Sequence, residues 1–426
     1  MSLKTIFFDG RICRSEPDGL DEIADALRKQ ARALHDIEVD ELVEFFDAVG
    51  RHWLRSPGIK KRFGPTLKFL AKFMDKGNLT TLLDTALRDR HALDGFVKLN
   101  KTKMLFHAQP RGLTVHWIAG NVPVLGIFSV LQALLTKNAC LVKASSRSYE
   151  DMTALLQSFS EVSTKNLKGN RIAKAVAVVL VEREDKESQR KLSMSADVRI
   201  AWGGREAVDA ITRLERRAET EDIIYGPKYS YAVIGREKLR GDVRPLAYKL
   251  AIDASAFDQY ACSSPHTVFV ERGGKASPLD FAEELAKQMD FVSKKVIQPG
   301  KPDPGRSLDI LKARNEYEFR GQVFSSKNTD WTVIYSDEQG LAQACFSRVV
   351  FVRPVDDISD VCAFSGRGMQ TMGVAVSDER RRTFADSATV RGIDRCPPIG
   401  EMSFFQSPWD GMFAFDRLVR WVTTYE

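Results

Sequence analysis

The stretch Thr114-Val115-His116-Trp117-Ile118-Ala119-Gly120-Asn121-Val122-Pro123, read with the residues that follow it to Lys143, decides the fold. Residues 113 to 119 form an apolar run that predicts a buried strand, and Pro123 suits the first turn of a helix. A helix over 124–136 and a strand over 139–143 complete a strand-helix-strand unit of a parallel sheet. The Gly-Asn-Val-Pro turn then lies at the carboxyl end of a strand, where α/β sheets bind ligands, so Asn121 is the first candidate functional residue.

The same alternation continues as far as residue 235. It predicts strands over 174–181 and 197–202, and helices over 148–161, 185–195 and 205–216. This pattern is typical of a doubly wound parallel sheet that binds a nucleotide. A GxGxxG fingerprint is absent, but Gly203-Gly204 follow a strand and open a helix, where free amides and the helix dipole could bind phosphate. A plain tight turn is the alternative.

A second group of candidate ligand-binding residues ends the strand at 139–143. Lys143, Ser145, Ser146 and Arg147 place two positive charges and two hydroxyls at one edge of the predicted sheet. A phosphate-bearing ribose would suit them. The alternative is a solvated loop with a helix cap at Ser148.

A second α/β unit begins near 236, with strands predicted over 266–271, 331–336, 348–353 and 371–376 and helices over 277–294 and 357–367. Cys262 lies at a loop-strand junction among small polar residues, which makes it a candidate nucleophile, although many loop cysteines are silent. Cys140, Cys345 and Cys362 lie in apolar runs typical of inert core thiols.

The first hundred residues predict a strand pair over 4–12 and helices over 20–34, 39–54, 65–75 and 79–91. We therefore expect three regions. They are a helical N-terminal region plus nucleotide-binding domain (1–235), a cysteine-bearing domain (236–397), and a C-terminal segment (398–426) that returns to the first domain or to an oligomer interface.

Composition excludes several classes. In 426 residues, 63 basic and 57 acidic side chains leave a net charge of +6, spread along the chain, so we expect no nucleic-acid partner. The six cysteines lack paired metal-ligand spacing, so we expect no metal and a reducing cytoplasm. The start of the chain has no leader pattern, and the most apolar stretch contains Gly120 and Pro123, so an integral membrane protein is not expected.

Four motifs follow one another along the chain: residues 118–123, residues 139–147, Ala201-Trp202-Gly203-Gly204-Arg205-Glu206, and Gln259-Tyr260-Ala261-Cys262-Ser263-Ser264-Pro265. Together they resemble the motifs of the aldehyde dehydrogenase superfamily, most closely those of the bioluminescence-type fatty-acyl-CoA reductases, the LuxC family. Residues 398–400 and 408–411 resemble the C-terminal pattern of that family. The resemblance spans about 110 to 415.

The resemblance implies a fold, a reaction and roles. The fold would have two doubly wound parallel-sheet domains and a β-flap that pairs between subunits of a homo-oligomer. An acyl thioester and reduced nicotinamide would give an aldehyde, with CoA as leaving group. Cys262 would accept the acyl group, and Asn121 with the Cys262 backbone N–H would form the oxyanion hole. Lys143 would contact the adenine-side ribose, Gly203 and Gly204 would approach the pyrophosphate, and an acyl-protein synthetase is an expected partner.

Two stretches depart from the superfamily pattern. Hydrolytic members carry a Glu-Leu-Gly-Gly-Lys segment whose carboxylate activates water, whereas this chain reads Ile224-Tyr225-Gly226-Pro227-Lys228. Without that base, water attack on an acyl-enzyme should be slow, which favours an acyl-CoA reductase. The Glu-x-Phe-Gly-Pro segment that holds the nicotinamide ribose corresponds here to Val350-Phe351-Val352-Arg353-Pro354, so that contact is not assigned.

We expect NADPH rather than NADH, although NADH remains an alternative. Lys143, Arg147, Ser145 and Ser146 suit a ribose 2′-phosphate, and no acidic residue stands beside Lys143. Two other functions stay open: a CoA-independent aldehyde dehydrogenase, and a non-catalytic subunit that carries acyl groups within a fatty-acid reductase complex.

Overall fold

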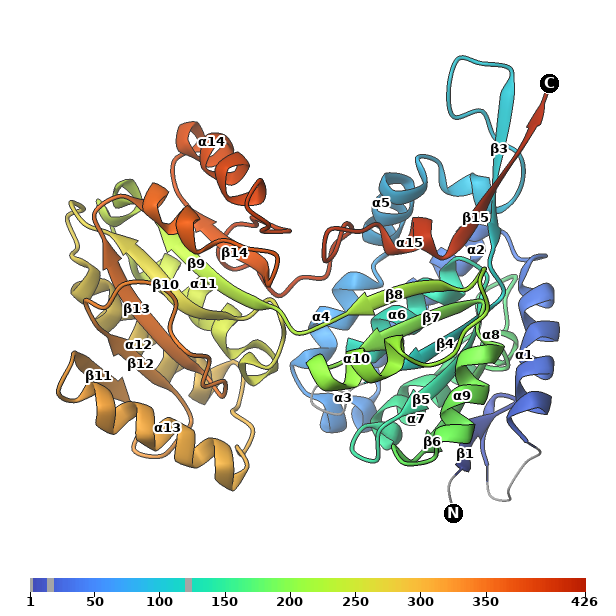
Figure 1. Ribbon diagram of the computed structural model, residues 1–426, viewed down its shortest axis with the longest axis horizontal. Helices are drawn as coiled ribbons and strands as arrows, with labels where there is room; N and C mark the ends of the chain where they lie inside the picture. Colours follow the sequence, from blue (N-terminus) through green and yellow to red (C-terminus); the bar gives the residue numbers. More distant parts are fainter. Residues whose placement is uncertain (1–2, 14–18, 119–124) are drawn as a thin grey trace. The chain divides into compact units, whose positions relative to one another are not determined.

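The computed structural model describes residues 3–13, 19–118 and 125–426 of the chain. The chain forms two compact units, Met1–Gly226 with Phe405–Glu426, and Pro227–Phe404. The second unit is therefore inserted, in sequence, between two segments of the first. In Figure 1 the first unit runs from blue to green and ends in red.

The first unit is built on a seven-stranded sheet, counted within the described residues, with the order β2-β1-β6-β5-β4-β7-β8. Strands β4 to β8 are parallel, whereas β1 pairs with β6 and β2 in antiparallel fashion. The bounds are β1 (Leu3–Phe8), β2 (Arg11–Ile12), β4 (Leu113–Trp117), β5 (Ala139–Ala144), β6 (Val176–Val181), β7 (Val198–Trp202) and β8 (Glu221–Tyr225). The predicted strands in this region are confirmed, and β8 is an additional strand.

The strand order reverses at β4. The chain steps from β4 to β5 to β6 in one direction, then returns to place β7 and β8 on the other side of β4. Ligands bind at such a switch point, at the carboxyl ends of the strands. The segments that follow β5 and β7 leave the sheet at the edge where β4 also ends, because these strands are parallel.

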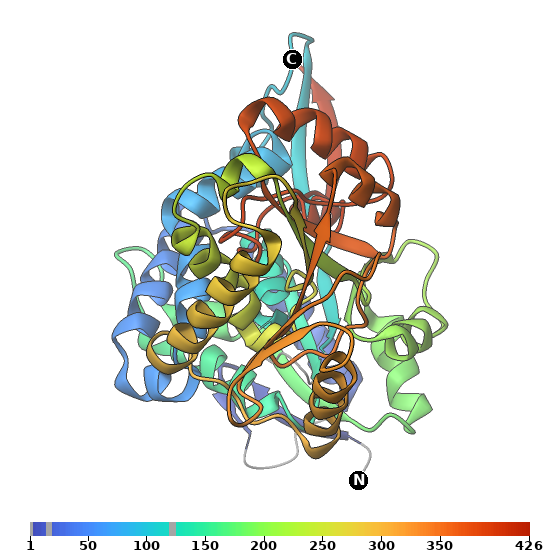
Figure 2. The same cartoon turned by 90° about the vertical axis from the view of Figure 1, so that its left-hand side faces the viewer.

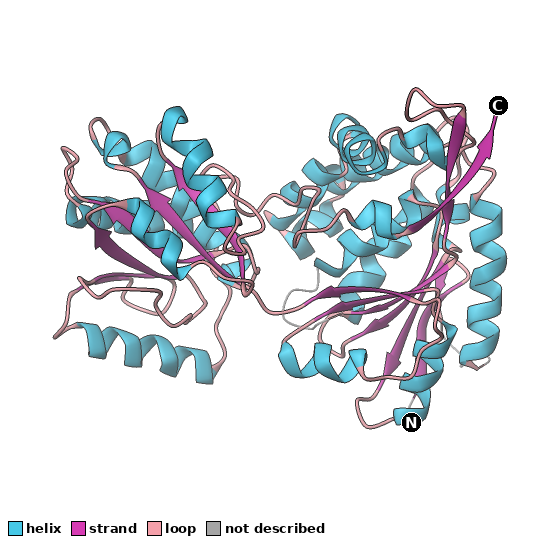
Figure 3. Ribbon diagram, turned by 45° about the horizontal axis from the view of Figure 1, so that its top comes forward, coloured by secondary structure: helices cyan, strands magenta, loops and turns pink. Residues whose placement is uncertain are grey.

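Helices cover both faces of this sheet (Figure 3). Helices α1 and α2 are amphipathic, as predicted, and bury one face each. Trp53 of α2 is fully buried and donates from Nε1 to Ser158 Oγ at 2.7 Å. The helices are α1 (Leu20–Leu34), α2 (Val39–Arg55), α3 (Pro57–Phe63), α4 (Thr66–Phe73), α5 (Lys76–Leu87), α6 (Leu125–Leu135), α7 (Tyr149–Gln157), α8 (Gly169–Ala173), α9 (Lys186–Ser195), α10 (Arg205–Thr212) and α15 (Ala414–Arg417), with 3-10 turns η1 (Arg90–Leu93) and η2 (Ser158–Glu161).

The last strand of the chain, β15 (Val419–Tyr425), pairs antiparallel with β3 (Met104–Pro110). The register runs from Val419 opposite Pro110 to Tyr425 opposite Met104, and the two strands lie side by side in Figures 1 and 2. The segment 405–426 thus belongs to the first unit. This two-stranded ribbon is the candidate for the expected β-flap, and its role in an oligomer stays a prediction.

The second unit contains a six-stranded sheet in the order β11-β12-β13-β10-β9-β14, in which β11 alone, among the strands described there, is antiparallel. The bounds are β9 (Tyr229–Ile234), β10 (Pro265–Glu271), β11 (Gln322–Ser325), β12 (Thr332–Tyr335), β13 (Val349–Val355) and β14 (Met369–Ala375). Because β9 pairs with β10 and β14, the chain enters this unit at Pro227, before the expected boundary at 235.

The helices of the second unit are α11 (Arg244–Ser255), α12 (Pro278–Lys295), α13 (Pro304–Tyr317) and α14 (Asp378–Thr389), with 3-10 segments η3 (Arg236–Leu239), η4 (Ala256–Gln259) and η5 (Ile358–Phe364). The segment predicted as helix 357–367 is thus the shorter 3-10 helix η5. Helices α11 and α12 bury their apolar faces with the sheet in one core that includes Leu250, Phe281 and Val350. None of the helices in the described ranges is long and apolar enough to cross a membrane.

Candidate active site

Cys262 lies in a short loop between η4 and β10, at the amino end of the second sheet. Two neighbouring strands hold its backbone. Ser230, at the start of β9, donates from Oγ to the Cys262 carbonyl oxygen at 2.6 Å. The Ser230 hydroxyl oxygen in turn accepts the Thr371 backbone N–H of β14 at 3.0 Å. The amino ends of three parallel strands therefore converge on the candidate nucleophile.

The sulfur of Cys262 is hydrogen-bonded to a side chain that the sequence did not single out. Gln370, fully buried on β14, points its Nε2 at Cys262 Sγ across 3.0 Å. An amide N–H beside sulfur stabilises the thiolate, which is the reactive form. Cys262 as a residue is half-buried, and its sulfur has a fixed donor.

The other cysteines have surroundings that oppose ionisation. Burial raises the pKa of Cys140 and Cys396 to about 12 and that of Cys345 to about 11. It also raises the pKa of Cys13 and of Cys362. A thiol with a raised pKa is a poor nucleophile at neutral pH. The prediction that Cys140, Cys345 and Cys362 are inert thus agrees with their environments.

Two left-handed turns brace the loop that leads to Cys262. Phe257, Asp258 and Gln259 have φ of 52°, 50° and 65°, and residues 346–348 have φ of 58°, 50° and 64°. Each such residue costs roughly 1–2 kcal/mol relative to its right-handed conformation. Several bonds offset this cost. The Ser347 N–H donates to the Asp258 carbonyl oxygen at 3.0 Å, and the Gln259 amide bridges both backbone groups of Val349.

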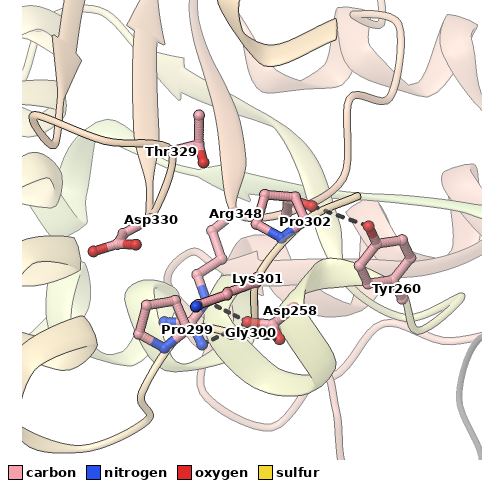
Figure 4. A pocket seen from close by; sticks show the side chains of 10 residues that line it. Asp258, Tyr260, Pro299, Gly300, Lys301, Pro302, Thr329, Asp330 and Arg348 are labelled. Atoms are coloured by element: carbon pink, nitrogen blue, oxygen red, sulfur yellow. Dashed lines mark hydrogen bonds and ion pairs between the residues drawn. The ribbon is translucent and has the colours of Figure 1, made fainter. Parts of the chain in front are cut away.

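An ion pair fastens the same two turns. Arg348, 1% exposed, pairs with the Asp258 carboxylate at 2.6 Å and also donates to the Ile297 and Gln298 carbonyl oxygens beyond the end of α12. Figure 4 shows Arg348 and Asp258 facing each other in a small pocket of about 40 Å³. The backbone before Cys262 is therefore tied to α12 and to the start of β13.

Aromatic rings pack at the same loop. Tyr260 stacks on Phe346 with ring centroids 5.5 Å apart, and His266 packs edge-on against Phe346. His266 is 3% exposed, and its Nδ1 has no partner among the described residues. Burial lowers the pKa of His266 to about 4, so the ring is neutral at neutral pH. None of these three residues was singled out as a site residue from the sequence, although Tyr260 lies within the motif at 259–265.

The predicted cofactor residues lie in the first unit. Lys143 lies one residue before the end of β5, and burial lowers the pKa of its ammonium group. This group has no carboxylate partner in the part of the chain described. A partly buried cation without a counter-ion suits an anionic ligand. Ser145 Oγ is bonded to Ser148 Oγ at 2.7 Å in the turn before α7. Ser148 is the N-cap residue of α7, but its side chain makes no capping hydrogen bond. Arg147 is exposed.

Gly203 and Gly204 follow β7, at the edge to which Lys143 also belongs, with β4 between the two strands. Gly204 is the N-cap residue of α10 and, as a glycine, supplies no side-chain cap to this helix end. An N-cap residue without a side chain leaves room for an anion at the first N–H groups of a helix. A Cβ added at Gly204 would meet none of the described atoms within 4 Å, so a ligand can approach its backbone closely.

Asn121 lies within residues 119–124, outside the described residues. The base-position stretch begins in β8, and Lys228 at its end pairs with Asp394 at 3.0 Å. Residues 350–354 form the buried interior of β13, which confirms the strand predicted over 348–353. The contact to the nicotinamide ribose stays unassigned.

The chain is similar to several known proteins. The family model "Acyl-CoA reductase (LuxC)" matches residues 34–421. The long-chain acyl-protein thioester reductase of Aliivibrio fischeri is 28% identical over 409 residues, covering 91% of this chain and 82% of that protein. A protein named long-chain acyl-protein thioester reductase 2, from Photobacterium leiognathi, is 26% identical over 412 residues, covering 91% and 82%.

Solved structures share the fold. Aldehyde dehydrogenase 21 from Physcomitrella patens superposes with a TM-score of 0.66 at 12% identity, covering 99% of this chain and 98% of that one. The NADP-dependent glyceraldehyde-3-phosphate dehydrogenase of Bacillus halodurans, complexed with NADP, has a TM-score of 0.61 at 14% identity, with 99% and 95% covered. The predicted aldehyde-dehydrogenase-like fold is confirmed. With the family model spanning most of its length, the chain belongs to the LuxC family of acyl-CoA reductases.

Proposed function

We propose that this protein reduces a long-chain acyl thioester to the aldehyde with NADPH, through an acyl-Cys262 intermediate. The setting of the Cys262 sulfur carries the proposal, since Gln370 donates to it at 3.0 Å while burial raises the pKa of the other thiols. The acyl donor is acyl-CoA or an acylated protein. The printed name of the Aliivibrio fischeri relative, an acyl-protein thioester reductase, supports the second donor.

The covalent chemistry balances with the groups at hand. The Cys262 thiolate attacks the acyl carbon, the bond from that carbon to the donor sulfur breaks, and the donor leaves as a thiolate of comparable basicity. Reduced nicotinamide, when bound, supplies the hydride that turns the acyl group into an aldehyde. The bond between that carbon and Cys262 then breaks, and its electron pair returns to the Cys262 sulfur. Ile224 at the base position has no carboxylate, which keeps hydrolysis to the acid slow.

The residues of the first unit fit NADPH. Lys143 is a partly buried cation with no acidic partner in the described ranges, and the uncapped start of α10 at Gly204 offers free amides to a pyrophosphate. Arg147, exposed beyond β5, supplies a second positive charge toward a 2′-phosphate. We include in the proposal a homo-oligomer assembled through the β3–β15 ribbon, and an acyl-protein synthetase as partner.

Acyl labelling tests the nucleophile. The full-length protein is incubated with a radiolabelled long-chain acyl-CoA and then treated with hydroxylamine, which releases thioester-bound acyl groups. We expect a hydroxylamine-sensitive label in the parent and in Cys345→Ser, and no label in Cys262→Ser. A Cys262→Ser protein that still formed aldehyde at the parent rate would refute the proposal.

Aldehyde formation separates the alternatives. The parent protein should consume NADPH and release aldehyde when long-chain acyl-CoA is added. Stable acylation without cofactor oxidation would instead identify an acyl-carrying subunit, and oxidation of aldehydes without CoA would identify an aldehyde dehydrogenase. Asn121→Ala should lower kcat by about 10²–10³-fold, the usual loss for one oxyanion-hole donor.

A further inference from the structure

Two strands beside Cys262 carry a β-bulge at the amino end. On β10, Pro265 pairs with Ser230 and Thr267 with Tyr231, so His266 is an extra residue. On β14, the partners of Tyr229 and Tyr231 are Met369 and Met372, so this strand also contains one extra residue. Bulges re-aim side chains that a regular pleat would direct elsewhere. The β14 bulge contains Gln370.

The orientation of the Gln370 amide follows from its neighbours. The Arg395 guanidinium, which can only donate, contacts Thr371 Oγ1 at 3.2 Å. The Thr371 hydroxyl proton is then available to Gln370 Oε1, 3.3 Å away. Because Oε1 accepts this proton, the amide NH₂ is the end that faces Cys262 Sγ at 3.0 Å. A buried chain of donors therefore runs from a guanidinium through a hydroxyl and an amide to the sulfur.

The backbone of Gln370 is fixed as firmly as its side chain. Its carbonyl oxygen accepts the Asp394 N–H at 3.1 Å and the Arg395 N–H at 3.0 Å. The Arg395 guanidinium is 7% exposed and also donates to the Met402 and Phe404 carbonyl oxygens, at 3.3 Å and 3.1 Å. The donor is thus pre-organised, so little reorganisation is needed when negative charge develops on sulfur.

We propose that Gln370 is a further catalytic residue, whose amide N–H stabilises the Cys262 sulfur whenever it carries negative charge. Its catalytic relevance rests on the proposed function. The thiolate is needed twice: as the nucleophile that attacks the thioester, and as the group expelled when the reduced acyl carbon collapses to the aldehyde. A neutral amide stabilises the thiolate in both steps and has no titration of its own in the working pH range.

The test is the pH dependence of Cys262 alkylation. Iodoacetamide reacts with thiolates, and mass spectrometry of the peptide that carries Cys262 separates this site from the other cysteines. In Gln370→Met, which keeps length but removes the donor, we expect the apparent pKa of Cys262 to rise by about one unit, or about tenfold less thiolate at neutral pH. In Gln370→Glu the rise should be larger, because a carboxylate repels the thiolate.

Two further variants calibrate the result. Thr371→Val removes the hydroxyl relay but leaves the amide, so it should raise the pKa less than Gln370→Met does. Gln322→Met makes the same substitution at an exposed position on β11 and should change nothing. Far-UV circular dichroism and urea midpoints establish that each variant is folded. Acylation by long-chain acyl-CoA should fall about tenfold in Gln370→Met at pH 7 and recover as the pH rises, which a merely structural defect would not do.

An unchanged Cys262 pKa in folded Gln370→Met and Gln370→Glu overturns the inference. This outcome is separable from failure of the proposed function. If Cys262→Ser still forms aldehyde, the proposed function fails. In that case, a Cys262 alkylation profile that shifts in the Gln370 variants would still support the contact between Gln370 and the Cys262 sulfur. If Cys262 is essential and its profile does not move, the proposed function stands and Gln370 has no part in it.

Discussion

His116 lies in the middle of β4 with both ring nitrogens occupied inside the protein. Its Nε2 is 2.8 Å from Thr114 Oγ1, and its Nδ1 is 3.1 Å from Ser129 Oγ. Burial lowers the pKa of His116 from 6.5 to about 3. Since the folded state resists protonation more than the unfolded chain does, stability is full above pH 6.5 and is lost as the pH falls toward 3. The substitution His116→Gln removes this dependence.

The size of the effect follows from the two pKa values. Between pH 6.5 and pH 5, about 1.5 pH units, His116 takes up a proton in the unfolded chain but not in the folded one. This difference lowers the free energy of unfolding by about 2 kcal/mol. Between pH 7.5 and pH 5, we expect the free energy of unfolding of the parent to fall by about 2 kcal/mol more than that of His116→Gln. This holds whatever the difference in stability between the two proteins at pH 7.5. Other groups titrate equally in both proteins and cancel.

Urea unfolding at the two pH values, followed by circular dichroism, measures this difference. Val130→Ala serves as the matched control, because it opens a cavity in α6 beside Ser129 without removing a titratable group. It should lower stability alike at both pH values. The reasoning is refuted if His116→Gln retains the pH dependence of the parent.

Three further predictions test other parts of the structure. Arg348→Met should lower the free energy of unfolding by about 3–5 kcal/mol in urea titrations, because it leaves Asp258 without its ion-pair partner, and Arg348→Lys should lower it less. Gly169→Ala should destabilise by at least about 1–3 kcal/mol in the same assay, since its Cβ would lie 1.8 Å from the Phe159 carbonyl oxygen. Lys143→Ala should raise the KM for NADPH about tenfold and that for NADH less, and loss of NADH use alone would contradict this assignment.

The sequence predicted most parallel strands of both sheets because buried strands read as continuous apolar runs, and Val176–Val181 is the clearest example. It missed β3, β8, β11 and β15, whose partly exposed or charged residues interrupt any such run, and it also missed the buried parallel strand β9. The helix predicted over 148–161 ends at Gln157 and continues as a 3-10 turn, a change of pitch that apolar periodicity does not distinguish.

The residues of the candidate site likewise divide into those that the sequence could indicate and those that it could not. Cys262 could be singled out because small polar neighbours at a loop-strand junction are a local signal. Gln370 could not, since it lies 108 residues from Cys262 and reaches it through a bulge. A bulge is a property of strand register, which depends on the partner strand rather than on the local sequence. The predicted strand began at 371, one residue too late to include Gln370.

The insertion of the second unit has a consequence for how the chain is made. The second unit is continuous, from Pro227 to Phe404, so a ribosome releases it whole before residues 405–426 emerge. The first unit lacks the partner of β3 until then, together with the Leu418 carbonyl oxygen that accepts the Asn138 amide at 3.1 Å. The unit that is translated first is therefore the last to be completed, because its closing strand β15 is the last part of the chain to be made.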